Sequence, residues 1–276
     1  MGLSLVFIRK WYNMNILFIG DIVGELGRRV VAYEIDKITS EFPVDFIIAN
    51  GENATHGKGL IEAHFNELLD AGIDVITLGN HYAAKKEIFN YIESYDSILR
   101  PNNLHHTIPG VGTGVFDCNG IKIRVTNLLG RVYMAIDVNN PFDDLESIIL
   151  NDDSDIHIVD FHAEATGEKY SLGYAFDGKV SAVLGTHTHV QTKDNRLLPN
   201  GTAYISDVGM CGPYNGILGS KKEEVIKRTW TSASAVFSIE DHDEAVFSAV
   251  LMTFDDVSHK CISIQPFYEI VEESEL

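Results

Sequence analysis

Five short apolar segments, each followed within a few residues by a polar group, constrain the fold of this chain more than any other feature. They lie at residues 15–20, 45–50, 74–79, 155–161 and 180–185. Their centres are continuous apolar runs, such as Ile16-Leu17-Phe18-Ile19, which are typical of strands covered on both faces. Helical segments or long connections separate them, so the sequence predicts an α/β fold.

Helix signals lie between these segments. The clearest helix carries one apolar stripe and ends at Gly72, a residue suited to a left-handed cap. The stripe consists of Ile61, Phe65, Leu68 and Leu69. Another helix is predicted to begin at Ser220, because Ser220 and Glu223 have the spacing of a capping box.

A different pattern, in which apolar and polar residues alternate, appears in two places. Residues 115–118 and 121–125 flank Asn119-Gly120, which is a strong hairpin signal. Three more antiparallel strands are predicted in the C-terminal part, at residues 233–239, 245–254 and 261–267. We therefore expect two mixed β-sheets packed face to face, with helices outside.

Residues 1–13 are set apart as an N-terminal extension, and residues 14–276 as a single domain. The extension is partly apolar, but Arg9 and Lys10 interrupt it and no small-residue cleavage site follows, so it does not read as an export signal. No stretch is long enough to cross a membrane. The three cysteines have no paired spacing, which fits a reducing compartment. We expect a cytoplasmic protein that does not act at a membrane.

The charge of the chain limits its partners. The formal net charge is -19, which sets up a potential that repels long polyanions. Wrapping of DNA or RNA on a broad basic face is therefore not expected. A small phosphate ester remains compatible with this charge, provided that bound metal reverses the field at the site.

Polar groups able to bind a metal follow each of the five predicted strands. Ligands of open α/β sheets gather beyond the carboxyl ends of strands, so these side chains are expected to meet at the rim of one sheet, although loops are polar in any protein. The candidates are Asp21, Glu52, Asn53, Asn80, His81, His162, His187 and His189.

Gly185-Thr186-His187-Thr188-His189 is the most specific motif. In extended backbone, residues two apart point to the same side, so the two histidines could serve neighbouring metals. In Gly79-Asn80-His81 the glycine allows a sharp turn, Asn80 offers a carbonyl oxygen and His81 can stand over the site as an acid. The alternative for the histidine motif is a polar loop with two solvated histidines, and the alternative for Gly79-Asn80-His81 is an Asn-capped turn.

His162 and Glu52 depend on their neighbours for their interpretation. His162 ends a buried strand, where a lone histidine is often a hydrogen-bonded core residue. Glu52 lies beside a tight turn, and its two carboxylate oxygens could bridge two cations. Without cysteine, the candidate set argues against a structural zinc site and for Mn²⁺, Fe or Zn²⁺ in a catalytic one. Two such cations clamp a phosphoryl group and lower the pKa of a bridging water.

Residues 15 to about 267 resemble the bacterial YmdB-type branch of the calcineurin-like metallophosphoesterases. The resemblance implies a four-layer αββα sandwich, two divalent or trivalent metal ions (iron or manganese first, then zinc) and phosphodiesterase activity toward 2′,3′-cyclic nucleotides. The stretches that carry it are Asn15-Ile16-Leu17-Phe18-Ile19-Gly20-Asp21, Asn50-Gly51-Glu52-Asn53, Gly79-Asn80-His81, Asp160-Phe161-His162-Ala163-Glu164-Ala165-Thr166 and Gly185-Thr186-His187-Thr188-His189-Val190-Gln191-Thr192.

Matched by position, the resemblance also implies roles. One metal would be held by Asp21, Glu52, Asn53 and His189. The other would be held by Glu52 as bridge, Asn80, His162 and His187. His81 would be the general acid. The chain departs from the family pattern after His81, where Tyr82-Ala83-Ala84 replaces Thr-Trp-Asp.

The hypothesis is hydrolysis of a small phosphodiester, in which hydroxide bridging the metals attacks phosphorus while His81 protonates the departing oxygen. A nucleotide phosphomonoesterase is one alternative, because the same clamp accepts either ester. A non-catalytic protein that senses a nucleotide, or serves as a scaffold on RNA-processing machinery, is another. The expected partner is a small phosphate ester such as a cyclic nucleotide, and a homo-oligomer is left open.

Other polar features favour structural roles. His56 and His64 read as solvated residues of a turn and a helix, and His105-His106 as part of an exposed loop. Residues 209–216 are rich in backbone donors and could wall a pocket or form a plain turn. The acidic run 272–275 reads as a solvated tail.

Overall fold

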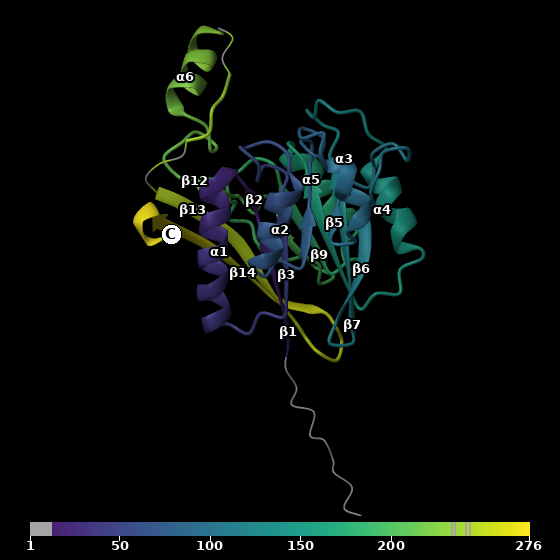
Figure 1. The fold of residues 1–276 in the computed structure, drawn as a ribbon. Coiled ribbons are helices and arrows are strands. Elements are labelled where there is room, and N and C mark those ends of the chain that lie inside the picture. The colour runs from purple at the N-terminus through teal and green to yellow at the C-terminus, as the bar shows by residue number, and fades with distance from the viewer. Residues whose placement is uncertain (1–12, 233, 235, 241, 243) are drawn as a thin grey trace, which may run out of the picture.

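The computed structural model describes residues 13–232, 234, 236–240, 242 and 244–276 (Figure 1). The helices are α1 (Gly24–Glu41), α2 (Glu62–Asp70), α3 (Ile88–Tyr91), η1 (Ile92–Ser94), α4 (Pro141–Ile149), α5 (Thr166–Ala175), α6 (Lys222–Thr231) and η2 (Glu273–Glu275). The strands are β1 (Met14–Ile19), β2 (Asp21–Ile22), β3 (Phe46–Asn50), β4 (Val75–Thr77), β5 (Ile98–Leu99), β6 (Thr113–Cys118), β7 (Ile121–Leu129), β8 (Ile156–His162), β9 (Ala182–Thr186), β10 (Arg196–Leu197), β11 (Ala203–Ile205), β12 (Met210–Pro213), β13 (Glu244–Phe254) and β14 (Cys261–Glu272).

The strands form two mixed sheets. The first has the order β2-β12-β13-β1-β3-β4-β5, with β14 paired to β13. In it β1, β3, β4 and β5 run parallel, while β13 is antiparallel to β1. The second sheet has the order β10-β11-β9-β8-β7-β6, in which β7, β8, β9 and β11 are parallel. Parallel pairing brings the carboxyl ends of consecutive core strands to one edge of each sheet.

The two sheets pack against each other and helices cover the outer faces. The layer between the sheets contains Phe18 and Ile48 from the first sheet and Ile158 and Leu184 from the second. The alternate residues of the same strands face outward, where α1 and α2 cover the first sheet and α4 and α5 the second. The predicted four-layer αββα sandwich is therefore confirmed (Figure 1).

Local signals explain several of these elements. Asn119 and Gly120 both have positive φ, 56° and 88°, as a tight hairpin turn between β6 and β7 requires. Helix α2 buries Phe65 and Leu68 and is followed by Gly72 at φ 99°, so its predicted end is confirmed. The predicted strands 245–254 and 261–267 are present as β13 and β14.

Two predictions in the segment that carries α6 are wrong. This helix begins at Lys222 after Lys221, whose side chain makes no cap hydrogen bond, and Ser220 instead lies in isolated bridges with Ile217 and Ile239. The predicted strand 233–239 is a connection in its described residues, apart from the bridge at Ile239, and residues 233 and 235 lie outside them. The segment with α6 projects from the body, so it has no sheet to join (Figure 1).

The ends and the charge pattern complete the fold. Residues 1–12 of the expected extension lie outside the described part of the chain. The acidic run near the C-terminus is not a free tail, because Glu273 pairs with Arg29 at 3.1 Å and Glu275 accepts a hydrogen bond from Tyr33.

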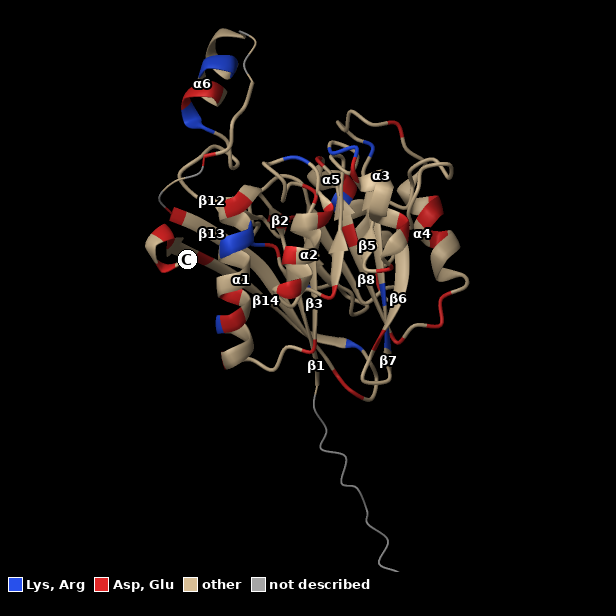
Figure 2. Ribbon diagram, in the orientation of Figure 1, with Lys and Arg blue, Asp and Glu red and all other residues tan. Residues whose placement is uncertain are grey.

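Acidic residues are spread over the helices and loops of the face shown, with no continuous basic stripe (Figure 2). Among the described helices, none is long and apolar enough to span a membrane.

Candidate metal centre

The eight candidate side chains come from the carboxyl ends of strands in both sheets. Asp21 opens β2 directly after β1, and residues 52–53 and 80–81 follow β3 and β4 of the same sheet. His162 is the last residue of β8, and residues 187–189 follow β9 of the second sheet. The expectation of a single sheet rim is therefore wrong. The site lies across the seam between two sheets, because the sandwich places both carboxyl edges on the same side.

Three of the candidates form one compact cluster. The Nε2 atom of His162 lies 3.2 Å from Oε1 of Glu52 and 3.1 Å from Nδ1 of His187. One ligand atom from each of these residues lies within 4.8 Å of the other two. Asn80 adds its Oδ1 at 2.9 Å from the same His162 nitrogen. Potential ligand atoms of Glu52, Asn80 and His187 therefore lie within 3.2 Å of His162 Nε2.

Hydrogen bonds behind the cluster fix which nitrogen of His162 is protonated. The Thr186 hydroxyl donates to Oδ1 of Asp160 at 2.7 Å, so it has no proton left for the His162 Nδ1 atom 2.9 Å away. The Asn50 amide near that Nδ1 donates to Asp160 and to the Leu78 carbonyl. His162 must therefore donate from Nδ1 to Thr186. Its Nε2 lone pair then faces the cluster, as in a metal-binding histidine.

In the neutral ring, the Nε2 lone pair of His162 would face the acceptor oxygens of Glu52 and Asn80. Burial alone would lower the pKa of His162, but the nearby carboxylates of Glu52, Asp21 and Asp160 raise it to about 9. Burial and the neighbouring His162 lower the pKa of His187 to about 3. Burial would raise the pKa of Glu52, yet His162 and His81 hold it well below its usual range. The cluster therefore favours one added positive charge, as a proton or as a metal cation.

Two further observations fit a bound cation. Asp21 is fully buried, and its Oδ2 accepts from the backbone N–H of His187, but no described residue donates a hydrogen bond to its Oδ1, which lies 3.8 Å from Nδ1 of His162. Burial raises the pKa of Asp21 to about 6. A Cβ at Gly79 would collide with the Glu52 carboxylate and the His162 ring, so a glycine at this position lets the two candidate ligands approach the backbone. The nitrogen and oxygen donors fit a borderline or hard metal.

The histidine motif reaches the site by a different backbone path than expected. His187 and His189 have positive φ, 104° and 65°, so the segment is not extended. The backbone N–H groups of His187 and Thr188 donate to the carboxylates of Asp21 and Asp207. His189 donates from Nδ1 to the Leu218 carbonyl, which leaves its Nε2 facing the Asn53 amide at 3.3 Å. The two imidazoles therefore face different neighbours.

His81 stands at the open side of the cluster. Its Nδ1 lies 2.8 Å from Oδ1 of Asn53 and 3.2 Å from Oε1 of Glu52, and its backbone N–H donates to Oε2 of Glu52. Its side chain is 30% exposed, in contrast to the buried Glu52 and His162. Because both atoms near Nδ1 are acceptors, the Nδ1 proton is held in place. The Nε2 atom of His81 is then the one that can exchange a proton with a ligand.

Several supporting residues were not found from the sequence. Thr77 and Asn50 also bond to the buried Asp160 carboxylate, so three donors hold it. Below the histidine motif, Lys169 and Asp207 form a buried ion pair at 2.8 Å. Polar residues within apolar strands could have pointed to Thr77 and Asp160. Nothing in the pattern of α5 distinguished Lys169 from a surface lysine.

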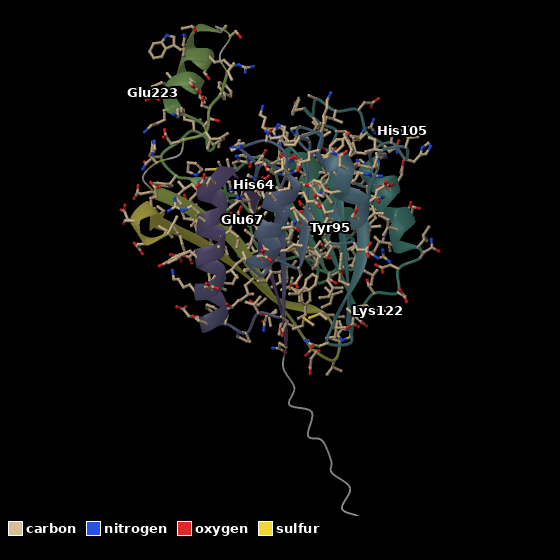
Figure 3. The ribbon with its side chains drawn as sticks, in the orientation of Figure 1. His64, Glu67, Tyr95, His105, Lys122 and Glu223 are labelled. Atoms are coloured by element: carbon tan, nitrogen blue, oxygen red, sulfur yellow. The ribbon has the colours of Figure 1, made fainter. Side chains whose placement is uncertain are left out.

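Three other histidines, His64, His105 and His106, have no recorded contact with the cluster. His105 lies on the α4 side of the molecule and His64 is part of α2 (Figure 3). His105 and His106 are exposed and contact each other, while the half-buried His64 bonds to the Thr55 hydroxyl. Residues 209–216 are not a plain turn. They contain β12 and contribute Met210, Tyr214 and Gly216 to a cavity beside His189.

Comparison with known proteins gives consistent results. The model of one family, described as YmdB-like protein, matches residues 17–267. The chain is 44% identical over 254 residues to the 2′,3′-cyclic-nucleotide 2′-phosphodiesterase of Bacillus subtilis (strain 168), covering 91% of this chain and 96% of that protein.

Solved structures show the same fold. The crystal structure of a phosphatase from Mycoplasma pneumoniae matches with a TM-score of 0.90 and 37% identity, covering 95% of each chain. A hypothetical protein from Thermus thermophilus matches with a TM-score of 0.88 and 37% identity, covering 94% of this chain and all of the other.

Proposed function

The chain belongs to the YmdB-like protein family, and from that premise we propose that it hydrolyses small phosphodiesters, 2′,3′-cyclic nucleotides first among them, at a dinuclear metal centre. As a member of this family it is a phosphoesterase. The observation that carries the proposal is the convergence of Glu52, His162 and His187, whose ligand atoms lie within 4.8 Å of one another.

The proposed ligand set follows the positions of the side chains. Glu52 lies between the two groups of candidates. We propose that Asn80, His162 and His187 hold one metal and that Asp21, Asn53 and His189 hold the other, as the resemblance implies; the Asn80, His162 and His187 side chains are in mutual contact, and so are those of Asn53 and His189. When bound, the metals would polarise the phosphoryl oxygens and lower the pKa of a water molecule. Iron or manganese is proposed first, with zinc next, as the resemblance implies; the seven nitrogen and oxygen donors suit all three metals.

The protein's own groups divide the remaining work. Asp160 and Thr186 orient the His162 ring, and Asn53 orients the His81 ring. In the proposed reaction hydroxide forms a new bond to phosphorus, the bond from phosphorus to the departing oxygen breaks, and His81 gives that oxygen a proton. The exposed position of His81 gives a substrate access to it.

Substitution of the bridging and acidic residues tests this proposal. Glu52→Gln should lower metal content, and both Glu52→Gln and His81→Ala should reduce turnover of a 2′,3′-cyclic nucleotide by about 10²–10⁴-fold. His105→Ala, at an exposed histidine away from the cluster, is the matched control. Metal analysis should accompany assays with Mn²⁺, Fe²⁺ and Zn²⁺. Unchanged turnover in metal-loaded His81→Ala would remove the proposed acid.

Two other functions are separated by the same assays. Comparing bis-(p-nitrophenyl) phosphate with p-nitrophenyl phosphate distinguishes a phosphodiesterase from a phosphomonoesterase. A metal-saturated protein that binds a nucleotide but hydrolyses no phosphate ester would instead be a sensor or scaffold. The placement of His81 beside Glu52 supports catalysis, because pure binding needs no proton donor. A small substrate, a cytoplasmic location and the absence of DNA and membrane partners belong to this proposal.

A further inference from the structure

A cavity of about 580 Å³ adjoins the candidate metal centre on the side of His189. It lies between the segment after β9, the end of β12 and the strands β13 and β14. The residues of its walls that bear on a ligand are His189, Lys193, Met210, Tyr214, Val246 and Tyr268. We call it the tyrosine cavity. A molecule in it would touch a candidate metal ligand directly.

The walls of the tyrosine cavity are held in place by the fold. The Gln191 amide donates to the carbonyls of Val208, Ala249 and Phe267, which ties the segment after β9 to the first sheet. His189 donates to the carbonyl of Leu218, another lining residue. The cavity therefore does not need to form around a ligand.

The chemistry of the lining suits a flat ring attached to an anion. Tyr214 and Tyr268 are 40% and 52% exposed, so their rings are available to a ligand, and Met210 and Val246 provide buried apolar contacts. Lys193 supplies a positive charge, and none of the lining residues is acidic. In a chain of net charge -19, a cavity with this balance is suited to a nucleotide.

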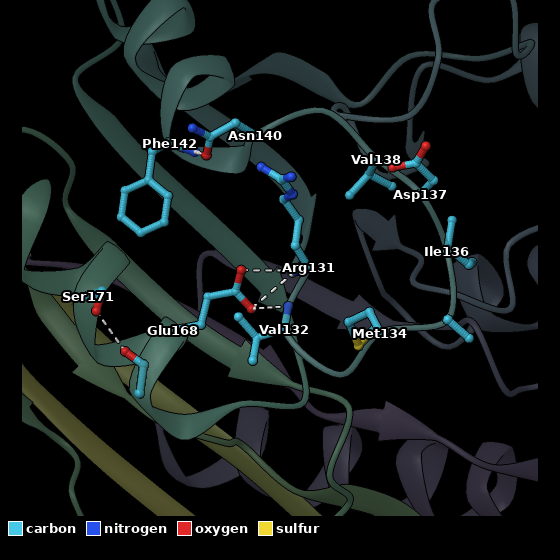
Figure 4. Close-up of a pocket in the computed structure, with 12 residues that line it drawn as sticks. Arg131, Val132, Met134, Ile136, Asp137, Val138, Asn140, Phe142, Glu168 and Ser171 are labelled. Carbon is cyan, nitrogen blue, oxygen red and sulfur yellow. Dashed lines mark hydrogen bonds between the residues drawn. The ribbon is translucent and has the colours of Figure 1, made fainter.

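A larger cavity elsewhere does not fit the same ligand. It has a volume of about 880 Å³ and is lined by the loop after β7 and the first turns of α4 and α5 (Figure 4). Glu168 and Asp137 line it against the single cation Arg131, and Glu168 is fixed there by the backbone N–H groups of Arg131 and Val132. None of the candidate metal ligands lines it. Its charge balance opposes a phosphate ester.

We propose that the tyrosine cavity binds the aromatic base of a nucleotide ester whose phosphoryl group lies at Glu52, His162 and His187. This proposal rests on the proposed function and adds a cause of substrate selectivity. The base packs against Tyr214 and Tyr268, and Lys193 attracts the anion. Esters that lack a base bind without this contact, so nucleoside esters are preferred.

The test compares a nucleoside 2′,3′-cyclic phosphate with the 2′,3′-cyclic phosphate of 1-O-methylribose, which has no base. In Tyr268→Ala the ratio of kcat/KM for the two substrates should fall about tenfold, the effect typical of losing one base-stacking ring. Tyr268→Phe should keep the wild-type ratio, because the ring remains. Arg131→Ala, in the larger cavity, is the control and should leave the ratio unchanged.

A binding measurement separates this proposal from the proposed function. Calorimetric titration of the metal-loaded protein with a nucleoside 5′-monophosphate should show weaker binding in Tyr268→Ala and Tyr214→Ala. Such weakening without hydrolysis of any ester would keep the base site and remove the enzymatic proposal. Hydrolysis with the same kcat/KM ratio in wild type and both tyrosine variants would overturn the base site, and a change in ratio confined to Arg131→Ala would place the base in the larger cavity.

Discussion

Replacement of Thr186 by valine tests the orientation of His162 most directly. Valine keeps the shape of threonine but removes the hydroxyl that donates to Asp160 and accepts from His162 Nδ1. Both partners are fully buried, so each loses a hydrogen bond that water cannot replace. Leaving a buried polar group without its partner costs about 1–3 kcal/mol. Two such groups give an upper value of about 6 kcal/mol.

The expected loss is smaller than that upper value. Asp160 keeps its bonds from Thr77 and Asn50, so most of the cost falls on His162. We expect the free energy of unfolding of the metal-free protein to fall by about 3 kcal/mol. Loss of a group that orients a metal-binding histidine lowers metal affinity by about 10–100-fold. Thr186→Val should therefore lower both the free energy of unfolding of the metal-free protein and its affinity for metal.

The assay combines urea unfolding of the metal-free protein with competition for Mn²⁺ or Zn²⁺ against a chelator of known affinity. Thr186→Ser should restore metal affinity, because it keeps the hydroxyl. Thr188→Val is the matched control, since Thr188 is anchored through its backbone N–H to Asp207. Full metal affinity in Thr186→Val would refute the assigned tautomer of His162.

Two further substitutions test the packing around the site. Gly79→Ala should lower the free energy of unfolding by about 1–3 kcal/mol and weaken metal binding in chelator competition, because the new methyl group meets Glu52 and His162. Gly167→Ala is the control and should have neither effect, because a Cβ there meets nothing within 4 Å. Lys169→Met should cost about 3–5 kcal/mol in urea unfolding, because it leaves the Asp207 carboxylate buried without its cation, in contrast to the exposed Lys222→Met. A cost below about 1 kcal/mol for Lys169→Met would show that the backbone donors alone hold Asp207.

The five core strands could be predicted from the sequence because each is a continuous apolar run with a polar residue at its end. Their division between two sheets could not, since nothing in a strand such as β8 shows which neighbour it pairs with. The shorter strands β10 to β12 carry too few residues to show a pattern. The capping box at Ser220 failed because the spacing of two residues fits many turns as well as a helix start.

Part of the candidate site could likewise be predicted from the sequence and part could not. The positions of Asp21, Glu52 and His162 follow from the rule that ligands gather at strand ends. The residues that orient them do not, because Asp160 and Thr77 look like ordinary strand positions until the chain is folded. The histidine motif was predicted to converge through extended backbone, whereas its φ angles are positive at His187 and His189. The folded structure explains this backbone conformation, because the N–H groups of His187 and Thr188 donate to the carboxylates of Asp21 and Asp207.

The position of the candidate ligands between the two sheets has a consequence for unfolding. Asp21, Glu52 and Asn80 belong to one layer of the sandwich, and His162, His187 and His189 to the other. A cation bound by ligands of both layers would hold the layers together, because separating them would require its release. Free metal at about 1,000 times its dissociation constant would add about 4 kcal/mol to the work of separation. The supply of metal in the surroundings would then govern the lifetime of the folded chain as well as its chemistry.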